Sequence, residues 1–243
     1  MKRRTGIKRS NSPSKNPAAK RPSRGARNAG SALPPTLNEE AYRRIEELIV
    51  TLELEPGSVV SEAMLSERIG IGTTPIREAL QRLAREHLVQ ILPRRGVIVT
   101  AVDVGQQLQV LETRRELDRL IARAAAARAT APEREEIAAL AARMEAAAAA
   151  GDTKAFLQCD NEMNARAARA ARNDVAARTA ATLHSTSRRF WFFHHTAHGQ
   201  AGKTMALHVE LARAMASGDA SRAAAASDRL IDDLQEFARS TLV

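Results

Sequence analysis

The sequence predicts a mainly α-helical fold that is interrupted by one short β-hairpin. Aromatic residues make up only 3% of the chain, alanine is abundant, and long segments rich in alanine and arginine favour helix. Apolar residues recur at helical spacing through most of the chain after residue 37, whereas the stretch near residues 88–100 becomes β-prone. With 243 residues, the chain has room for one large or two small domains.

The net charge of +9 comes from the N-terminal segment. Residues 1–38 hold ten Lys and Arg residues and no acid, so the remaining residues sum to a charge of −1. This segment is rich in Ser, Pro, Asn and Gly and has almost no apolar residues, which predicts a disordered tail over residues 1–36. A basic arm attracts DNA phosphates without distinguishing sequence. A solubilising extension with no other role is the alternative, and both interpretations remain open.

The composition argues against membrane and secreted classes. No apolar stretch reaches the length needed to cross a bilayer, and no apolar core follows the basic N-terminus as it does in a secretory signal. Cys159 is the only cysteine, so an internal disulfide is excluded. A single unpaired thiol fits a reducing compartment, and we expect a cytoplasmic protein with no membrane partner.

Residues 37–102 are expected to form the first folded domain. Thr36–Glu39 has the pattern of a capping box and opens an amphipathic helix that Pro56–Gly57 stops. Ser61 is expected to cap a second, short helix that ends at Gly70.

A third helix and a hairpin complete this domain. Thr74 is the expected N-cap of the third helix, with Pro75 as its first residue. The β-prone stretches VQIL and VIVT then flank the turn PRRG, which presents Arg94 and Arg95 at its tip. This order of three helices plus a β-hairpin wing predicts a winged helix-turn-helix.

In such a domain the third helix enters the major groove of DNA by its N-terminus, and the wing lies on the backbone or in the minor groove. Residues 72–96 hold five arginines against two acids, although residues 39–103 as a whole carry more acids than bases. The positive face is therefore local. An ordinary helix-plus-hairpin domain with a solvated charged face is the alternative.

The ordered pattern TPIREAL followed by PRRG resembles the DNA-binding domain of GntR-family bacterial transcription regulators. The resemblance implies that Thr74 and Arg77 of the third helix lie at the operator, together with the wing. Gly72–Thr73 replaces the Ser-Arg usual in the family, and Ala63 stands where a basic residue often follows Glu62. Because arginine commonly contacts guanine, we expect a different half-site. The candidate DNA-binding residues are Thr73, Thr74, Arg77, Arg94, Arg95 and Gly96.

Residues 103–243 are expected to form an all-α bundle of six or seven antiparallel helices, whose interior is a usual place for a ligand. Caps and breaks divide this segment at residues 103, 131–133, 151–152, 174, 199–202 and 217–219. Three motifs resemble the helical, FCD-type effector-binding domain of the FadR-type branch of the same family: Arg114-x-x-Leu117-Asp118, Asp160-x-x-Met163-Asn164, and His208 followed by Ala214-Met215-x-x-Gly218-Asp219.

That resemblance implies a divalent metal held by an Asp, a His four residues later and two further His, which in turn accepts a carboxylate effector. Side chains four apart share one face of a helix and can converge on one ion. This chain keeps Asp160 and His208, but Asn164 stands at the first His position and Leu230 near the last. Asn is a weak ligand and Leu is none.

The candidate metal ligands are therefore Asp160 and His208, an incomplete set for Zn, Ni or Mn. Two alternatives stay open. Either Arg114, Asp160, Asn164 and His208 bind a small carboxylate effector through hydrogen bonds and charge alone, or they are a polar remnant that binds nothing.

The stretch RRFWFFHH, residues 188–195, holds most of the aromatic residues and, with His198, invites a metal interpretation. We favour aromatic side chains that fill the bundle core, because His194 and His195 are adjacent and cannot share a helix face. His184 is a further candidate ligand at the pocket.

Two further features of this half remain to be placed. Arg188 and Arg189 are candidates to meet an acidic effector. Cys159 is expected to be a packed thiol rather than a redox sensor.

These features predict a sequence-specific transcription regulator, not an enzyme, controlled by a small acidic metabolite. One helix-turn-helix contacts only a half-site, so we expect a homodimer on a palindromic double-stranded DNA operator, with repression as the expected mode. The first alternative is an architectural DNA binder driven by the basic tail. The second is a metal-dependent helical enzyme with a DNA-binding appendage, although no nucleophile-base pair lies near Asp160 in the sequence.

Overall fold

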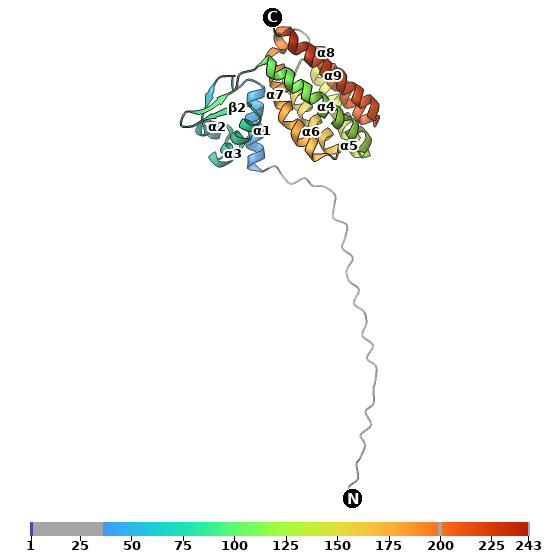
Figure 1. Ribbon diagram of the computed structural model, residues 1–243, viewed down its shortest axis with the longest axis horizontal. Helices are drawn as coiled ribbons and strands as arrows, with labels where there is room; N and C mark the ends of the chain where they lie inside the picture. Colours follow the sequence, from blue (N-terminus) through green and yellow to red (C-terminus); the bar gives the residue numbers. More distant parts are fainter. Residues whose placement is uncertain (2–35, 199–200, 243) are drawn as a thin grey trace. The chain divides into compact units, whose positions relative to one another are not determined.

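The computed structural model describes residue 1, residues 36–198 and residues 201–242 (Figure 1). The predicted basic tail therefore lies outside the described residues except at its two ends. The fold is mainly α, as predicted: three helices and a small sheet are followed by six further helices in the described part of the chain. No helix in these residues is both long and apolar enough to cross a bilayer.

The first domain follows the predicted order of elements. Thr36 and Glu39 form the predicted capping box at the start of α1, Ser61 Oγ accepts from the backbone N–H of Met64 at 3.1 Å, and Gly70 ends α2 with φ of 73°. The elements are α1 (Leu37–Val50), β1 (Val59–Val60), α2 (Glu62–Ile69), α3 (Thr73–Arg85), β2 (Val89–Leu92) and β3 (Gly96–Val99).

The start of α3 differs from the prediction. The helix begins at Thr73 with Gly72 as its N-cap, so Thr74 is a helical residue and not the cap. Pro75 then occupies the third helical position. Proline is tolerated there because the first N–H groups of a helix have no carbonyl partner within it.

The wing is a three-stranded antiparallel sheet and not only a hairpin. Its strand order is β1-β3-β2, with Val59 opposite Ile98 and Val60 opposite Val97. The sequence analysis missed β1 because a two-residue strand has too few positions to show alternation. This added strand ties the wing to the connection between α1 and α2.

The apolar face of α3 lies in the core of the first domain. Ile76, Ala79, Leu80 and Leu83 are each at most 2% exposed and pack with α1 and the sheet. Burial of each large apolar side chain contributes about 1.5–3 kcal/mol of stabilising free energy. Together these four residues fix the orientation of the helix. The polar face of α3, which starts at Thr73, therefore points to solvent.

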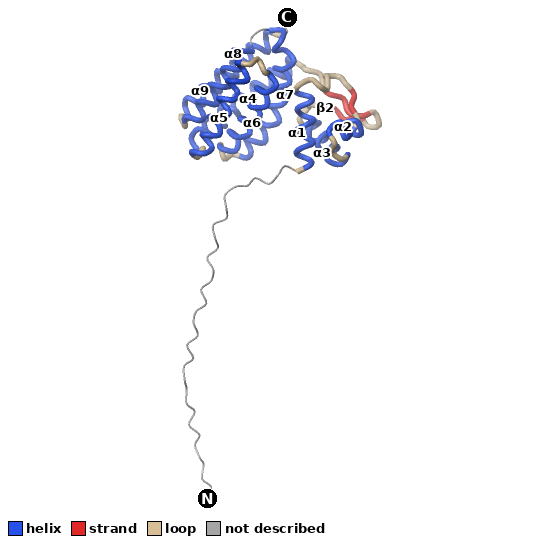
Figure 2. Tube along the Cα trace, turned by 180° about the vertical axis from the view of Figure 1, so that it is seen from behind, coloured by secondary structure: helices blue, strands red, loops and turns tan. Residues whose placement is uncertain are grey.

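The second half of the described chain is a helical bundle. Its helices are α4 (Val104–Arg128), α5 (Ala131–Ala149), α6 (Thr153–Ala170), α7 (Asp174–His198), α8 (Ala201–Ser217) and α9 (Ala220–Ser240). Figure 2 shows these helices packed side by side. Helix α4 packs against α9 and α7, and α5 packs against α6 and α8. Asp103 caps α4 as predicted.

Two local predictions in the bundle were wrong. Gly202 lies inside α8, which begins at Ala201, rather than in a loop. Phe193 is 44% exposed, whereas Phe190 and Trp191 are buried as predicted. Successive helical residues are about 100° apart around the axis, so four consecutive aromatic residues cannot all face the core.

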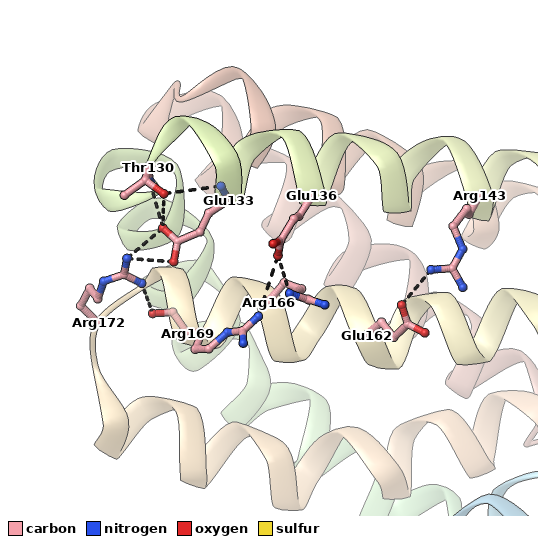
Figure 3. A network of polar contacts seen from close by, with 8 residues as sticks. All are labelled: Thr130, Glu133, Glu136, Arg143, Glu162, Arg166, Arg169 and Arg172. Atoms are coloured by element: carbon pink, nitrogen blue, oxygen red, sulfur yellow. Dashed lines mark hydrogen bonds and ion pairs between the residues drawn. The ribbon is translucent and has the colours of Figure 1, made fainter. Parts of the chain in front are cut away.

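Helices α5 and α6 are joined on their outer faces by a row of ion pairs (Figure 3). Arg143 lies 2.8 Å from Glu162, and Arg166 pairs with Glu136. At the end of the row, Arg172 contacts Glu133, the residue that also closes the capping box of α5 on Thr130. These pairs are half-exposed, so each is expected to contribute little to stability.

Candidate functional site

The first turn of α3 presents the predicted DNA-binding residues to solvent. Thr73, Thr74 and Arg77 are all exposed. The tight turn at Gly70–Gly72 places them at the free N-terminal end of the helix, and the buried stripe described above keeps the rest of the helix against the core. A helix N-terminus also carries a partial positive charge that favours phosphate.

Arg77 is held by Glu62, a contact that the sequence analysis did not anticipate. Its Nε donates to Glu62 Oε1 and Oε2 at 2.9 and 3.1 Å, and one terminal nitrogen donates to Oε2 at 2.6 Å. The hydrogen bond from Arg77 lowers the pKa of the Glu62 carboxyl below its ordinary value. Glu62 thus orients the guanidinium while adding a negative charge near the surface that would face DNA.

Replacing Glu62 by glutamine is expected to raise affinity for random DNA by roughly 1.5- to 5-fold, the effect of one exposed charge. Affinity for the operator should rise less, because Arg77 loses the partner that orients it. The ratio of operator to random affinity therefore falls. Fluorescence anisotropy on both duplexes at one salt concentration measures this ratio, and an increased ratio would contradict the orienting role.

Arg94 and Arg95 are exposed at the turn between β2 and β3, where the sequence placed them. Gly96, the third predicted DNA-binding residue of the wing, is also needed for the fold of the turn. Its φ is 102°, and a Cβ at this position would lie 3.1 Å from the carbonyl oxygen of Val60. Gly96 is thus required by the backbone, because only glycine adopts this conformation beside β1 without strain.

Replacing Gly96 by alanine is therefore expected to destabilise the first domain by about 1–3 kcal/mol. Thermal or urea unfolding measures the loss. Gly202→Ala is the control, because Gly202 is helical with open space around it and alanine favours helix there. Equal stability of G96A and the unmodified chain would show that the turn has another conformation.

A polar cluster fixes α3 against α1. Tyr42 donates its hydroxyl hydrogen to Glu86 Oε2 at 2.7 Å, and Arg82 donates Nε to Glu86 Oε1 at 3.1 Å. The guanidinium of Arg82 also lies 3.6 Å from the centre of the Tyr42 ring. Burial, with the nearby carboxylates, raises the pKa of Tyr42 far above its ordinary value. Helices α1 and α3 are therefore expected to move as one body.

The four predicted effector residues lie together. Arg114 of α4, Asp160 and Asn164 of α6, and His208 of α8 all line one cavity inside the bundle. We call it the central cavity; Trp191, His184 and Arg188 of α7 also line it. Its volume is about 20 Å³, which is room for about one water molecule.

Asp118 organises one wall of the central cavity. Its carboxylate accepts from Arg114 Nε at 2.9 Å and lies 2.8 Å from His184 Nε2. Burial alone would raise the pKa of Asp118, but the charges of Arg114 and His184 outweigh it and hold the pKa well below its ordinary value. His184 thus reaches the cavity, as predicted, with its Nε2 engaged by Asp118.

The opposite wall does not fit the metal site of the resemblance. His208 Nδ1 lies 2.8 Å from the carbonyl of Thr204, and its Nε2 lies 3.7 Å from Asp160 Oδ1. Asn164 donates to the same oxygen at 3.2 Å. Among the described residues, no three His, Cys, Asp or Glu side chains converge as metal ligands. The leucine that lines the cavity is Leu234 and not Leu230. Two donors do not fit a resident divalent metal.

Arg188 and Arg189, although adjacent in α7, have different surroundings. Arg188 lines the central cavity, whereas Arg189 does not line it. Arg189 donates to the carbonyls of Thr100 and Ala101 at 3.1 Å each and so holds the connection between β3 and α4. Its burial lowers its pKa to about 10, which leaves it protonated at neutral pH.

The remaining candidates in α6 and α7, Cys159, His194 and His195, do not line the central cavity. Cys159 is buried, and burial raises the pKa of its thiol, as expected for a packed cysteine. His194 and His195 follow the buried aromatic pair in α7, and His195 stacks on Trp191 with ring centres 4.9 Å apart. The side chain of His198 lies outside the described residues.

Comparisons with known proteins agree with both halves of the fold. Residues 37–99 match the family described as bacterial regulatory proteins of the gntR family, and residues 109–233 match the FCD domain. A solved structure of E. coli McbR/YncC superposes with a TM-score of 0.74 over 86% of this chain and 100% of that chain, at 16% identity, which shows a shared fold.

Two curated relatives resemble part of this chain. An uncharacterized HTH-type transcriptional regulator in an unstable DNA locus of Streptomyces ambofaciens is 41% identical over 68 residues, 28% of this chain and 29% of the relative. The HTH-type transcriptional repressor RspR of Escherichia coli K12 is 33% identical over 94 residues, 39% of this chain and 41% of the relative. The chain thus spans less than half the length of these relatives.

The FCD match alone covers about half of the sequence, and the gntR match covers the winged helix-turn-helix that precedes it. The gntR family is described as one of bacterial regulatory proteins. The chain is therefore a GntR-family transcription regulator with an N-terminal helix-turn-helix domain and a C-terminal FCD domain.

Proposed function

We propose that this regulator is a homodimeric repressor that binds a palindromic operator and responds to a small carboxylate in the central cavity. Binding to DNA rests on the exposed first turn of α3 and on the wing arginines Arg94 and Arg95. Repression is the mode named for the E. coli relative RspR. Such a protein acts where the bacterial chromosome lies, in the cytoplasm.

The observation that carries the choice of ligand is the pair of buried arginines in the central cavity. Arg114 and Arg188 both line it and are 6% and 8% exposed. Trp191 lines it as well, and its buried Nε1 has no hydrogen-bond acceptor in the described part of the chain. Buried donors of this kind call for an acceptor, and a carboxylate offers two oxygens to them.

A metal is not needed for this assignment. Arg114 and Arg188 already face the carboxylates of Asp118 and Glu46, so a ligand carboxylate is held by replacing such a partner, and arginine can hold it through two parallel hydrogen bonds. Asp160 lies on the same cavity and disfavours a ligand of high negative charge. The site therefore favours a monocarboxylate or small dicarboxylate.

Trp191 is the only tryptophan in the sequence, so its fluorescence reports on the central cavity. We would titrate the chain with acetate, malonate and citrate at constant ionic strength, with sodium chloride as the control. At least one acid is expected to change the emission and to weaken binding to DNA from beside the chain's own gene. Operator binding that none of the three acids alters at millimolar concentration contradicts control by a small acid.

Trp191→Phe keeps an aromatic ring in the cavity and removes only the N–H donor. Acid binding by this variant, followed by calorimetry, is expected to weaken by roughly 10- to 150-fold, the value of one hydrogen bond to a charged group. The dimer is tested separately by light scattering, which should give about twice the 26.4 kDa mass of one chain. A monomer that still binds a palindrome would contradict the dimeric arrangement.

A further inference from the structure

Arg188 belongs to the central cavity and to the DNA-binding domain at the same time. Its guanidinium lines the cavity, donates to Asn161 Oδ1 at 2.7 Å and contacts Ser185 Oγ at 3.3 Å. The same group donates to the carboxylate of Glu46 on α1, 142 residues away in the sequence. A ligand in the cavity and the contact with α1 would therefore involve the same guanidinium.

Glu46 depends on this contact. The residue is only 4% exposed, and within the described part of the chain its hydrogen-bond donor is Arg188. Burial on its own would lower the pKa of Arg188, but the carboxylates of Glu46 and Asp160 outweigh it. Removing one partner of a buried ion pair leaves a buried charge without compensation, which is strongly unfavourable. Glu46 can therefore stay buried only while Arg188 faces it.

The contact continues to the DNA-binding surface. Helix α1 packs directly on α3, and the cluster of Tyr42, Arg82 and Glu86 joins the two helices. A displacement of α1 at Glu46 thus moves the first turn of α3, with Arg77, as one body. Val50 of α1 is also buried in the apolar core of the bundle, whereas the ion pair of Lys154 with Glu53 at 3.0 Å is half-exposed and weak.

Two larger clefts border the central cavity at Arg188. The central cavity is too small for a carboxylic acid at about 20 Å³, whereas two clefts between α1 and the bundle have volumes of about 310 and 450 Å³. Both clefts are lined by Glu46 and Arg188. Movement of the Arg188 side chain therefore joins the cavity to larger spaces and makes room for a ligand.

Of the two cavity arginines, Arg188 is the one whose partner can leave. Arg114 pairs with Asp118 four residues away on the same helix, and Asp118 is also held by His184. Arg188 pairs with an acid on another domain. A ligand carboxylate that replaces Glu46 leaves the charge around Arg188 unchanged, so the exchange costs little inside the cavity.

We propose that Arg188 is the switch of this regulator: a carboxylate entering the central cavity takes its guanidinium from Glu46, and the unpaired Glu46 drives α1 and α3 away from the bundle. The proposal rests on the proposed function, since it needs an anionic ligand in that cavity. Arg189, which holds Thr100 and Ala101 by backbone contacts, keeps the connection to α4 in place during this movement.

The test compares Glu46→Gln with the unmodified full chain, using acetate, malonate and citrate as probes. In the unmodified chain the effective acid should weaken operator binding by roughly 5- to 150-fold, the usual range of allosteric coupling, and in E46Q by less than about twofold. Because the competing carboxylate is gone, E46Q should bind the acid more tightly in a Trp191 fluorescence titration. Hydrogen exchange in α1 should also rise without any acid.

Glu47→Gln is the matched control, because Glu47 is the next residue of α1 and accepts from Gln158 at 2.7 Å without touching Arg188. It should keep the full acid response and normal exchange in α1. The double variant E46Q/R188Q covers the case in which E46Q folds poorly, since two amides can hydrogen-bond without a buried charge. It should stay folded and lose the response.

The outcomes separate the two claims. An unmodified chain whose operator binding no probe changes overturns both the proposed acid control and the switch. A normal response in the unmodified chain together with an equal response in E46Q, or in the folded double variant, overturns the switch alone. Loss of the response in E46Q with tighter acid binding, while E47Q behaves normally, supports it.

Discussion

Replacing Arg77 by alanine is expected to lower operator affinity by roughly 5- to 150-fold while affinity for random DNA changes much less. Arg77 is exposed on the first turn of α3, the part of the helix that enters the major groove in this motif. An arginine there can form two hydrogen bonds to guanine, so its loss removes sequence discrimination rather than general attraction. Fluorescence anisotropy with operator and random duplexes measures both affinities.

The contact with Glu62 requires one additional variant. In R77A the Glu62 carboxylate loses its partner and repels phosphates, which weakens binding to every sequence. The double variant E62Q/R77A removes this charge and isolates the effect on discrimination. Arg85 is exposed at the far end of α3, and replacing it by alanine should weaken binding to the operator and random duplexes about equally. An unchanged operator-to-random ratio in E62Q/R77A would show that Arg77 does not contact bases.

Replacing Asp118 by asparagine is expected to cost about 3–5 kcal/mol of stability, because it leaves a buried arginine without its counter-charge. Asp118 holds both Arg114 and His184 at the wall of the central cavity. Asparagine keeps the shape of the side chain and removes only the charge. Urea unfolding of both proteins at neutral pH measures the difference.

The same pair predicts a pH dependence. Because the folded protein lowers the pKa of Asp118, its contribution is present above the ordinary carboxyl value of 3.8 and is lost as the pH falls below it. The stability difference between the unmodified chain and D118N should therefore shrink as the pH falls below the ordinary carboxyl value of 3.8. A difference that grows below that pH would contradict the ion pair.

Glu162→Gln is the control for both experiments. Glu162 pairs with Arg143 at 2.8 Å between α6 and α5, and both side chains are about half exposed (Figure 3). Water and salt screen such a pair, so its loss should cost no more than about 1 kcal/mol. Equal losses in E162Q and D118N would show that the burial of Asp118 has no energetic consequence.

The elements that could be predicted from sequence are those with local signals. The capping box at Thr36, the Asp103 cap and the glycine at the end of α2 each need only a few neighbouring residues, and each was confirmed. The N-cap of α3 was wrongly assigned to Thr74 because Gly72 has no side chain to mark the position. Strand β1 was missed because its pairing with β3 depends on residues nearly forty positions away.

At the central cavity, too, some residues could be identified from sequence motifs and others could not. Motifs within one helix identified Arg114, which pairs with Asp118, and Asp160, which pairs with Asn164. The structure brings Arg114, Asp160 and Asn164 to one cavity. The contact of Arg188 with Glu46 joins two domains and has no signal in sequence spacing. Arg188 and Arg189 are adjacent and looked equivalent, and only their different directions from α7 separate them.

The most direct test of the account is a gel-shift titration at physiological salt on DNA from beside the chain's own gene and on random DNA. The full chain and a chain lacking residues 1–35 are compared on both. Preferential binding to the first DNA that survives removal of the tail is the predicted result, because α3 and the wing then select the sequence. Equal binding to both DNAs that disappears with the tail would contradict it and favour an architectural DNA binder.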